Sequence, residues 1–223
     1  MMRSIAIDGP AGAGKSTLAK ALAKKIGYIY VDTGAIYRCV GLYALENGIS
    51  PRDIPAVEAC LPNVEISLSY DETGSQRMHL CGKDVTDHIR TPEVSMAASA
   101  VSAIPAVRAF LLEMQRDMAR RYNVIMDGRD IGTVVLPNAD VKVFLTASPE
   151  ARAKRRYLEL QAKGDGATYE EVLRDMEKRD RDDSTRAAAP LKAAEDAVLL
   201  DTTSYTLEES IALLEKITAG KTV

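Results

Sequence analysis

The stretch Gly9-Pro10-Ala11-Gly12-Ala13-Gly14-Lys15-Ser16 matches the pattern GxxxxGK followed by Ser or Thr, and it decides the fold expected for this chain. An apolar run, Ser4–Asp8, precedes it, and a helical pattern covers residues 15–25. Glycines let backbone N–H groups converge on phosphate oxygens, and the start of a helix adds partial positive charge. The stretch therefore predicts a strand, a phosphate-binding loop and a helix, which together bind a nucleoside triphosphate.

Chemical roles within this loop follow from charge and geometry. Lys15 reaches the β and γ phosphates and neutralises charge there, so we expect it to be catalytic. The Ser16 hydroxyl is placed for Mg²⁺, the metal cofactor that accompanies ATP. The residues predicted to bind ATP in this segment are Gly9, Pro10, Ala11, Gly12, Ala13, Gly14, Lys15, Ser16 and Thr17.

Short apolar runs alternate with longer helical periods along the chain, which is typical of a parallel α/β sheet. The predicted strands are Ser4–Asp8, Ile29–Asp32, Val124–Asp127, Val141–Leu145 and Val198–Asp201. Each is short and almost continuously apolar, as strands buried on both faces are. Four of the five end in Asp, at the edge where α/β folds bind ligands. We therefore expect a five-stranded parallel sheet flanked by helices.

One segment breaks this alternation and indicates an insertion. Two strand-like runs, 64–70 and 77–81, surround a polar turn, which is the pattern of an antiparallel hairpin. We expect residues 63–100 to form a small inserted subdomain over the substrate cleft or beside it, and residues 1–62 and 101–223 to form the core.

The composition excludes several classes of function. The 223 residues carry a net charge of −3, which argues against a nucleic-acid coat and against an anionic membrane surface. No apolar run approaches the ~18 residues of a membrane helix, and Met1 leads directly into a strand without a signal peptide. Three cysteines without a CxxC and only two histidines predict neither a disulfide framework nor a zinc site. We expect a cytoplasmic monomer without nucleic-acid or membrane partners.

Arginines indicate which chemistry accompanies triphosphate binding. They follow two of the predicted strands and recur on later helical segments, at Arg38, Arg129, Arg152, Arg155, Arg156, Arg179 and Arg186. Such residues are ordinarily a solvated helix face, but several guanidinium groups around one cleft suit a polyphosphate. No general base stands out, and none is needed if the acceptor is itself a phosphate dianion. The absence of a guanine-reading NKxD argues against a GTPase switch.

Four motifs occur in order along the chain. They are Ile7-Asp8 with the phosphate loop, Asp32-Thr33-Gly34-Ala35-Ile36-Tyr37-Arg38, Asp127-Gly128-Arg129-Asp130-Ile131-Gly132-Thr133 and Arg179-Asp180-x-x-Asp183-x-x-Arg186. Together they resemble bacterial cytidylate kinases, which phosphorylate CMP and dCMP, and the resemblance covers nearly the whole chain. It implies a P-loop nucleoside monophosphate (NMP) kinase fold, ATP with Mg²⁺ as donor, CMP or dCMP as acceptor, and an inserted NMP-binding subdomain.

The resemblance also implies roles for individual residues at the acceptor phosphate and sugar. Arg38, Arg129 and Arg186 would hold the acceptor phosphate, and the last two would also be catalytic. Arg179 and Asp183 would meet the sugar hydroxyls.

A lid over ATP is implied in the same way. The helix with Arg152, Arg155 and Arg156 would lead into it, and Arg152 and Arg156 would bind ATP. We expect the lid over about residues 152–166, with its tip at Lys163-Gly164-Asp165-Gly166, a loop-forming run.

Thr33, Arg108 and Asp130 would read the cytosine. A carboxylate and a hydroxyl suit its exocyclic amine, and an arginine suits its ring acceptors. Uracil would meet Asp130 acceptor to acceptor, which such a site rejects. Three alternatives stay open: Arg108 as a solvent arginine, Thr33 as the N-cap of the following helix, and Asp130 as a brace for Arg129 only.

Two alternative functions also stay open. One is a regulatory P-loop module that holds nucleotide without turnover, and the other is a kinase for a different small acceptor such as UMP. A CMP kinase releases ADP from ATP when CMP is added, and this dependence on CMP distinguishes it from both alternatives.

Overall fold

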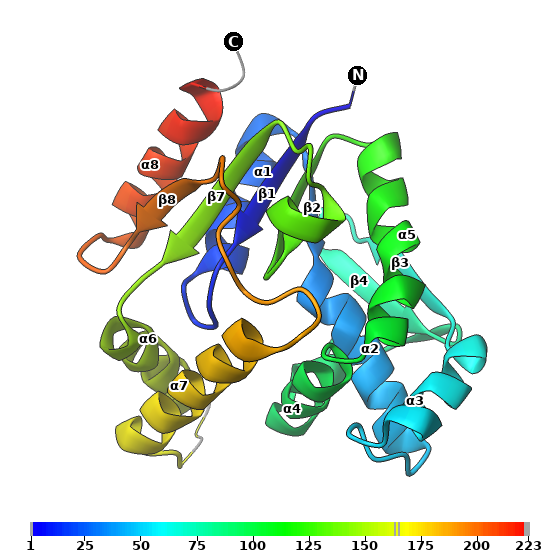
Figure 1. The fold of residues 1–223 in the computed structure, drawn as a ribbon. Coiled ribbons are helices and arrows are strands. Elements are labelled where there is room, and N and C mark those ends of the chain that lie inside the picture. The colour runs from blue at the N-terminus through cyan, green and yellow to red at the C-terminus, as the bar shows by residue number, and fades with distance from the viewer. Residues whose placement is uncertain (1, 163, 165, 221–223) are drawn as a thin grey trace.

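Five parallel strands form the central sheet in the order β2-β6-β1-β7-β8 (Figure 1). The computed structural model describes residues 2–162, 164 and 166–220, so Lys163 and Asp165 of the expected lid tip lie outside the described residues. The strands are β1 Ser4–Asp8, β2 Ile29–Asp32, β6 Val124–Gly128, β7 Val141–Thr146 and β8 Val198–Asp201. All five predicted strands are confirmed, and β6 and β7 each extend one residue further than expected.

Apolar side chains explain why β1 lies at the centre of the sheet. It pairs with β6 on one side and with β7 on the other, and its residues from Ile5 to Asp8 are all buried. Alternate residues of the strand point to opposite faces. Ile5 and Ile7 therefore enter one apolar core, whereas Ala6 enters the other.

Helices cover both faces of this sheet. Helices α1 and α8 pack on the Ile5 and Ile7 face, and α2, α4 and α5 contribute to the core on the opposite face. The helices are α1 Lys15–Ile26, α2 Thr33–Glu46, α3 Ile54–Cys60, α4 Pro92–Val101, α5 Pro105–Arg121, α6 Pro149–Ala162, α7 Tyr169–Thr185 and α8 Leu207–Gly220. Short helical turns occur at η1 Leu61–Asn63, η2 His88–Arg90 and η3 Ile131–Val135, the last a single π-helical turn.

The insertion contains a three-stranded antiparallel sheet rather than a two-stranded hairpin. Its strands are β3 Ile66–Tyr70, β4 Gln76–Leu80 and β5 Lys83–Asp84. The third strand has only two residues, which is too short for an alternating pattern to reveal. Buried Met78 and Leu80 share one apolar core with Ile36 of α2, so the inserted sheet packs on the main body. The boundaries 63–100 stay a prediction.

Helices α6 and α7 form a hairpin with a small core of its own. Ala153, Val172 and Met176 are its buried residues, and Ala11 of the phosphate loop packs against them. The expected capping box at the start of α7 is confirmed, with Thr168 and Glu171 bonding reciprocally. The hairpin therefore rests directly on the phosphate loop.

No single helix among the described residues is long and apolar enough to cross a bilayer. Helices α4 and α5 meet that criterion only as a pair, and the pair is bent by 100° at its break. Both contribute buried residues to the core described above.

Close packing of α2 against α4 generates a first prediction. A Cβ atom added at Gly41 would lie 2.9 Å from the backbone nitrogen of Ala98, a distance that requires the helices to separate. We expect Gly41→Ala to lower the free energy of unfolding by about 1–3 kcal/mol through overpacking, measured by urea denaturation. Gly220→Ala is the control, because a Cβ there meets nothing within 4 Å; equal stability of the two variants would contradict the prediction.

Candidate active site

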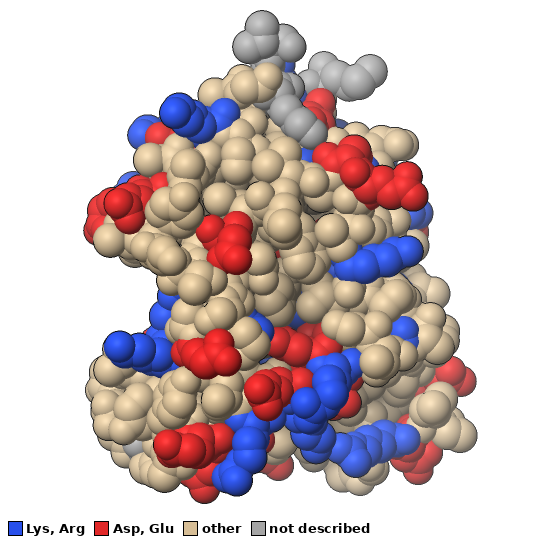
Figure 2. Space-filling model, turned by 60° about the vertical axis from the view of Figure 1, so that its left-hand side comes forward, with Lys and Arg blue, Asp and Glu red and all other residues tan. Residues whose placement is uncertain are grey.

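The carboxyl ends of the parallel strands carry the polar residues that the sequence singled out. In Figure 1 the α6–α7 hairpin lies on one side of this edge, and α2 and α4 lie on the other. Figure 2 shows acidic and basic side chains crowded over the lower part of one face, at the level of α6 and α7, beneath a hollow at mid-height. The edge of the sheet and the elements on its two sides therefore frame the candidate site.

Positive φ angles and close contacts favour glycine at two positions of the phosphate loop, Gly9 and Gly12. A Cβ at Gly9 (φ 151°) would lie 1.9 Å from the carbonyl oxygen of Leu145, and one at Gly12 would meet Met176. Lys15 is buried and donates from Nζ to the carbonyl of Pro10 at 2.7 Å, so it folds back over the loop. Burial, and then repulsion from Arg129, lower the pKa of Lys15 well below its ordinary value. An anion in the loop would relieve both effects.

Asp127, at the end of β6, is a site residue that the sequence analysis did not assign. Its carboxylate accepts from the Ser16 hydroxyl at 2.7 Å and from the buried Tyr30 hydroxyl at 2.9 Å. Burial, and then repulsion from Asp32, raise the pKa of Asp127. The signal was available, because Asp127 is one of the four aspartates that end predicted strands.

Asp32, rather than Thr33, caps helix α2. Its side chain accepts from the N–H of Ala35 at 2.9 Å, so the expectation of Thr33 as N-cap is wrong. Thr33 is the first helical residue, and its hydroxyl donates to the carbonyl of Asp127 at 2.7 Å. Because the Thr33 hydroxyl has donated its hydrogen, its oxygen can only accept further hydrogen bonds, which agrees with the acceptor role that was expected for Thr33.

Two arginines face the Asp32 carboxylate. Arg90, from the inserted segment, lies 2.9 Å from it, and Arg38 lies 3.9 Å away. Gln76 of β4 accepts a hydrogen bond from the backbone N–H of Asp32 at 2.8 Å. The insertion is thus tied to the start of α2, and neither Arg90 nor Gln76 was identified from the sequence.

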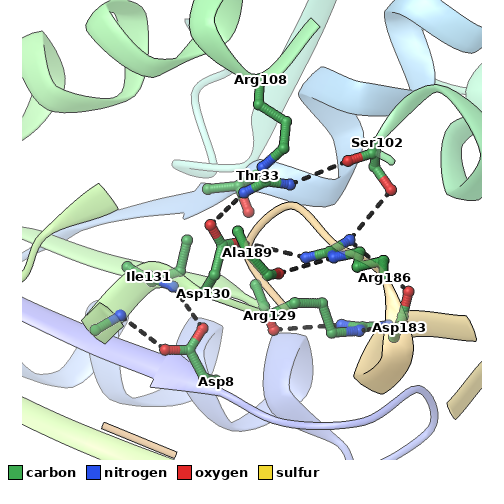
Figure 3. Close-up of polar contacts among 12 residues, drawn as sticks. Asp8, Thr33, Ser102, Arg108, Arg129, Asp130, Ile131, Asp183, Arg186 and Ala189 are labelled. Atoms are coloured by element: carbon green, nitrogen blue, oxygen red, sulfur yellow. Dashed lines mark hydrogen bonds and ion pairs between the residues drawn. The ribbon is translucent and has the colours of Figure 1, made fainter. Parts of the chain in front are cut away.

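Asp130 lies between two arginines (Figure 3). It forms an ion pair with Arg108 and lies 3.7 Å from Arg186. The Arg108 side chain is only 11% exposed, so the alternative of a solvent arginine is wrong. Ser102 supports both guanidinium groups, through its carbonyl to Arg108 at 3.2 Å and its hydroxyl to Arg186 at 3.3 Å.

Arg129 pairs with Asp183 of α7 rather than with Asp130. Its Nε donates to Asp183 at 2.8 Å, and the same carboxylate lies 3.9 Å from Arg186. The alternative in which Asp130 only braces Arg129 is therefore wrong. The structure brings Arg129, Asp183 and Arg186 together, although two of them lie some 54 residues apart in sequence.

Several positively charged side chains lie close together between the phosphate loop and these acidic groups. Burial, and then repulsion from Arg129, lower the pKa of Arg179 to about 10, and Arg38 also repels it. Arg129 also lowers the pKa of Lys15 and of Arg38, although burial is the larger cause for each. Buried Nε of Arg179 and Nη2 of Arg186 have no hydrogen-bond partner within the described residues. Buried donors without partners are costly, and phosphate oxygens are the partners that guanidinium groups fit best.

Arg152 and Arg156 differ in their surroundings. Arg152 is buried and bonds to the carbonyls of Ala147 and Ala11 at 2.8 and 3.0 Å, and to Asp180 at 2.7 Å. Arg156 lies 3.1 Å from Glu159 near the surface. Arg152 thus supports the phosphate loop, and contact of either arginine with ATP stays a prediction.

Two side-chain oxygen groups beside the phosphate loop suit the coordination of a magnesium ion that accompanies the nucleotide. The described residues contain no group of three or more His, Cys, Asp or Glu side chains that would hold a metal by themselves. The Ser16 hydroxyl and the Asp127 carboxylate lie beside each other, and Mg²⁺ typically takes one or two such ligands with phosphate oxygens and water.

Comparison with known proteins agrees with this geometry. A family model for cytidylate kinase matches residues 5–219. The chain belongs to the cytidylate kinase family. Cytidylate kinase of Caldicellulosiruptor bescii is 53% identical over 214 residues, covering 96% of this chain and 93% of that protein. The relative from Carboxydothermus hydrogenoformans is 52% identical over 217 residues, covering 97% of each.

The fold of this cytidylate kinase family member recurs at low sequence identity. A solved structure of an uncharacterized protein from Eubacterium ventriosum superposes with a TM-score of 0.50 at 13% identity. The match covers 98% of this chain and 99% of that one, and it supports the fold alone.

The buried Tyr30–Asp127 hydrogen bond generates a second prediction. Tyr30→Phe leaves one oxygen of a buried carboxylate without its donor, so we expect the free energy of unfolding to fall by about 1–3 kcal/mol. Tyr28→Phe is the control, because Tyr28 packs against the same core and no hydrogen bond of its hydroxyl occurs within the described residues. Thermal or urea unfolding measures both, and equal stabilities would contradict the prediction.

Proposed function

We infer that this chain transfers the γ phosphate of ATP to CMP or dCMP, giving ADP and CDP or dCDP. It is an ATP-dependent nucleoside monophosphate kinase of the cytidylate kinase family, with relatives of that name about half identical over nearly the whole chain. The observation that carries the proposal is the cluster of repelling arginines with orphaned buried donors beside the phosphate loop. Its monomeric state, its location in the cytoplasm and its lack of other partners stay predictions.

The donor side is the phosphate loop. Residues 9–17 hold the phosphates of ATP through backbone N–H groups, and Lys15 turns from the Pro10 carbonyl toward the β and γ phosphates. Ser16 and Asp127 would hold Mg²⁺, which supplies further positive charge at the transferring phosphoryl group. Because Asp127 already accepts from Ser16, these two oxygens are oriented before nucleotide binds.

The acceptor side is the arginine cluster. We assign Arg38, Arg129 and Arg186 to the acceptor phosphate, and Arg179 with Asp183 to the sugar hydroxyls. Each arginine that is paired now would exchange a carboxylate for a phosphate oxygen, as Arg129 would exchange Asp183. Bidentate contacts to phosphate favour this exchange.

The base is read by Thr33, Arg108 and Asp130. Thr33 has already donated its hydrogen to Asp127, so its oxygen accepts from the cytosine amine. The Asp130 carboxylate is a second acceptor, and Arg108, which pairs with it, donates to the ring acceptors of cytosine.

The reaction requires positioning and charge neutralisation more than proton transfer. An oxygen of the acceptor phosphate forms a bond to the γ phosphorus while the bond from that phosphorus to the β–γ bridging oxygen breaks. A monophosphate is largely a dianion at neutral pH and needs no general base. Lys15, Arg129 and Arg186 neutralise the charge that develops, which makes them the catalytic residues.

Two further segments complete the proposal. Residues 152–166, in and after α6, act as the lid over ATP, because a kinase must exclude water to avoid hydrolysis. Arg152 and Arg156 lie at its base, and residues 63–100 act as the NMP-binding subdomain.

The proposed reaction has a direct test. ADP formation from ATP and Mg²⁺ should be fastest with CMP or dCMP among CMP, dCMP, UMP, AMP and GMP. Lys15→Ala should lower kcat with CMP by about 10²–10³-fold, the usual loss for one such donor, while Lys24→Ala, an exposed lysine of the same helix, keeps normal turnover. ADP release without an acceptor, or fastest turnover with another monophosphate, would refute the proposal.

Base reading by Asp130 yields a separate prediction. Asp130→Asn replaces one acceptor oxygen with a donor, so activity with CMP should fall far more than activity with UMP. An unpaired buried group of this kind costs about 1–3 kcal/mol. The ratio of kcat/KM for CMP to that for UMP should therefore fall by roughly 10- to 100-fold. Asp117→Asn is the control, an aspartate on α5 that also pairs with arginines. An unchanged ratio in Asp130→Asn would show that Asp130 does not read the base.

A further inference from the structure

Asp8 holds a turn of the chain from which the base-reading residue projects. It is the last residue of β1 and is 4% exposed. Its two carboxylate oxygens accept from the backbone N–H groups of Ile131 and Gly132, each at 2.7 Å (Figure 3). Asp130 immediately precedes these residues. The phosphate-loop pattern begins one residue after Asp8, so it does not account for this carboxylate.

Asp8 is fixed by the sheet, and its carboxylate holds the turn that begins at Ile131. Asp8 pairs in register with Gly128 on one side and with Phe144 on the other. The chain leaves β6 at Gly128 and enters the π-helical turn η3 at Ile131. The Asp8 carboxylate supplies the acceptors for the first two N–H groups of η3, those of Ile131 and Gly132.

The orientation of Asp130 depends on the same turn. The carbonyl of Asp130 accepts from the N–H groups of Val134 and Val135 at 2.9 and 3.2 Å, which fixes its backbone at the start of η3. Its side chain then lies between Arg108 and Arg186. A shift of the Ile131 and Gly132 backbone would therefore move the Asp130 carboxylate relative to both arginines.

Stability alone does not favour an ionised carboxylate at this position. Burial raises the pKa of Asp8 from 3.8 to about 6, although both backbone N–H groups oppose the change, and nearby Asp130 adds repulsion. A carboxyl group with a raised pKa in the folded state favours folding when protonated. That contribution is lost as the pH rises through about 6, so the ionised form at neutral pH is retained against a cost in stability.

We propose that Asp8 is a positioning residue for acceptor specificity, holding the turn at 129–132 so that Asp130 faces the cytosine amine. This inference rests on the proposed function, because it concerns how the CMP site is held. The proposal predicts different effects on the two substrates. The backbone of Asp8 is fixed within the sheet, so loss of its carboxylate should free the turn that holds the CMP site and leave the ATP-binding phosphate loop in place.

The test compares Asp8→Asn and Asp8→Ala with the wild-type chain. Asn keeps the size of the side chain but turns an NH₂ group toward one of the two N–H groups, whereas Ala removes both acceptors without adding a donor. We expect each variant to raise KM for CMP by about tenfold, and to lower the ratio of kcat/KM for CMP to that for UMP by about tenfold. KM for ATP should stay within about twofold of wild type, because the sheet holds the loop. Titration calorimetry with CMP and with UMP gives the same comparison without turnover.

Asp140→Asn is the matched control. Asp140 accepts from the backbone N–H of Ser4 at 2.7 Å, so it makes the same kind of contact at the opposite end of β1. We expect it to leave the CMP to UMP ratio and both KM values unchanged. Its thermal midpoint should be no higher than that of Asp8→Asn, since only the Asp8 variant removes a buried charge.

Three results would overturn the inference. The first is an unchanged CMP to UMP ratio in both Asp8 variants, and the second is a parallel rise of KM for ATP and for CMP. The third is a reduced thermal midpoint with unchanged affinity for CMP, which would make Asp8 structural only. Failure of the proposed function is distinct from all three, because it would appear as a wild-type chain without CMP-dependent ADP formation.

Discussion

Compensation of charge at one edge of the sheet is the constraint on which the site depends. Arg129 lowers the pKa of Lys15, of Arg38 and of Arg179, although burial is the larger cause for each. Carboxylates at the ends of β1, β2 and β6 face them, and a fourth comes from α7. Removing the acids would leave mutually repelling cations in a buried place, and removing the bases would leave buried carboxylates. Phosphate oxygens would be acceptors for the buried Nε of Arg179 and Nη2 of Arg186, which have no hydrogen-bond partner within the described residues.

Strand order is what brings the acids together. Asp32 and Asp127 are register partners in neighbouring strands, and Asp8 pairs with Gly128, one residue further along. This arrangement requires β6, which comes late in the sequence, to insert between β1 and β2. Helices α2, α3, α4 and α5 and the whole inserted sheet therefore separate Asp32 from Asp127 in the sequence, and the register of β6 brings these two residues side by side.

Locally determined features could be predicted from the sequence, and features set by distant contacts could not. The phosphate loop, the five strands and the cap at Thr168 follow from patterns a few residues long, and the structure confirms them. The choice between Asp32 and Thr33 as N-cap could not be made, because both residue types cap helices and they are adjacent. The partners of Asp130 and the burial of Arg152, which lies on a largely polar helix, depend on elements far away in sequence. Local sequence patterns do not indicate such long-range contacts.

The two sides of the site are connected to different parts of the molecule and meet at one residue. The phosphate loop is attached to the α6–α7 hairpin, through Arg152 on the Ala11 carbonyl and through the packing of Ala11 against the cluster that contains Met176. The start of α2 is attached to the inserted sheet through the Gln76–Asp32 hydrogen bond. Asp127 touches both, because its carboxylate accepts from Ser16 and its carbonyl accepts from Thr33. The end of β6, a buried strand that is paired on both of its edges, therefore connects the phosphate loop to the start of α2.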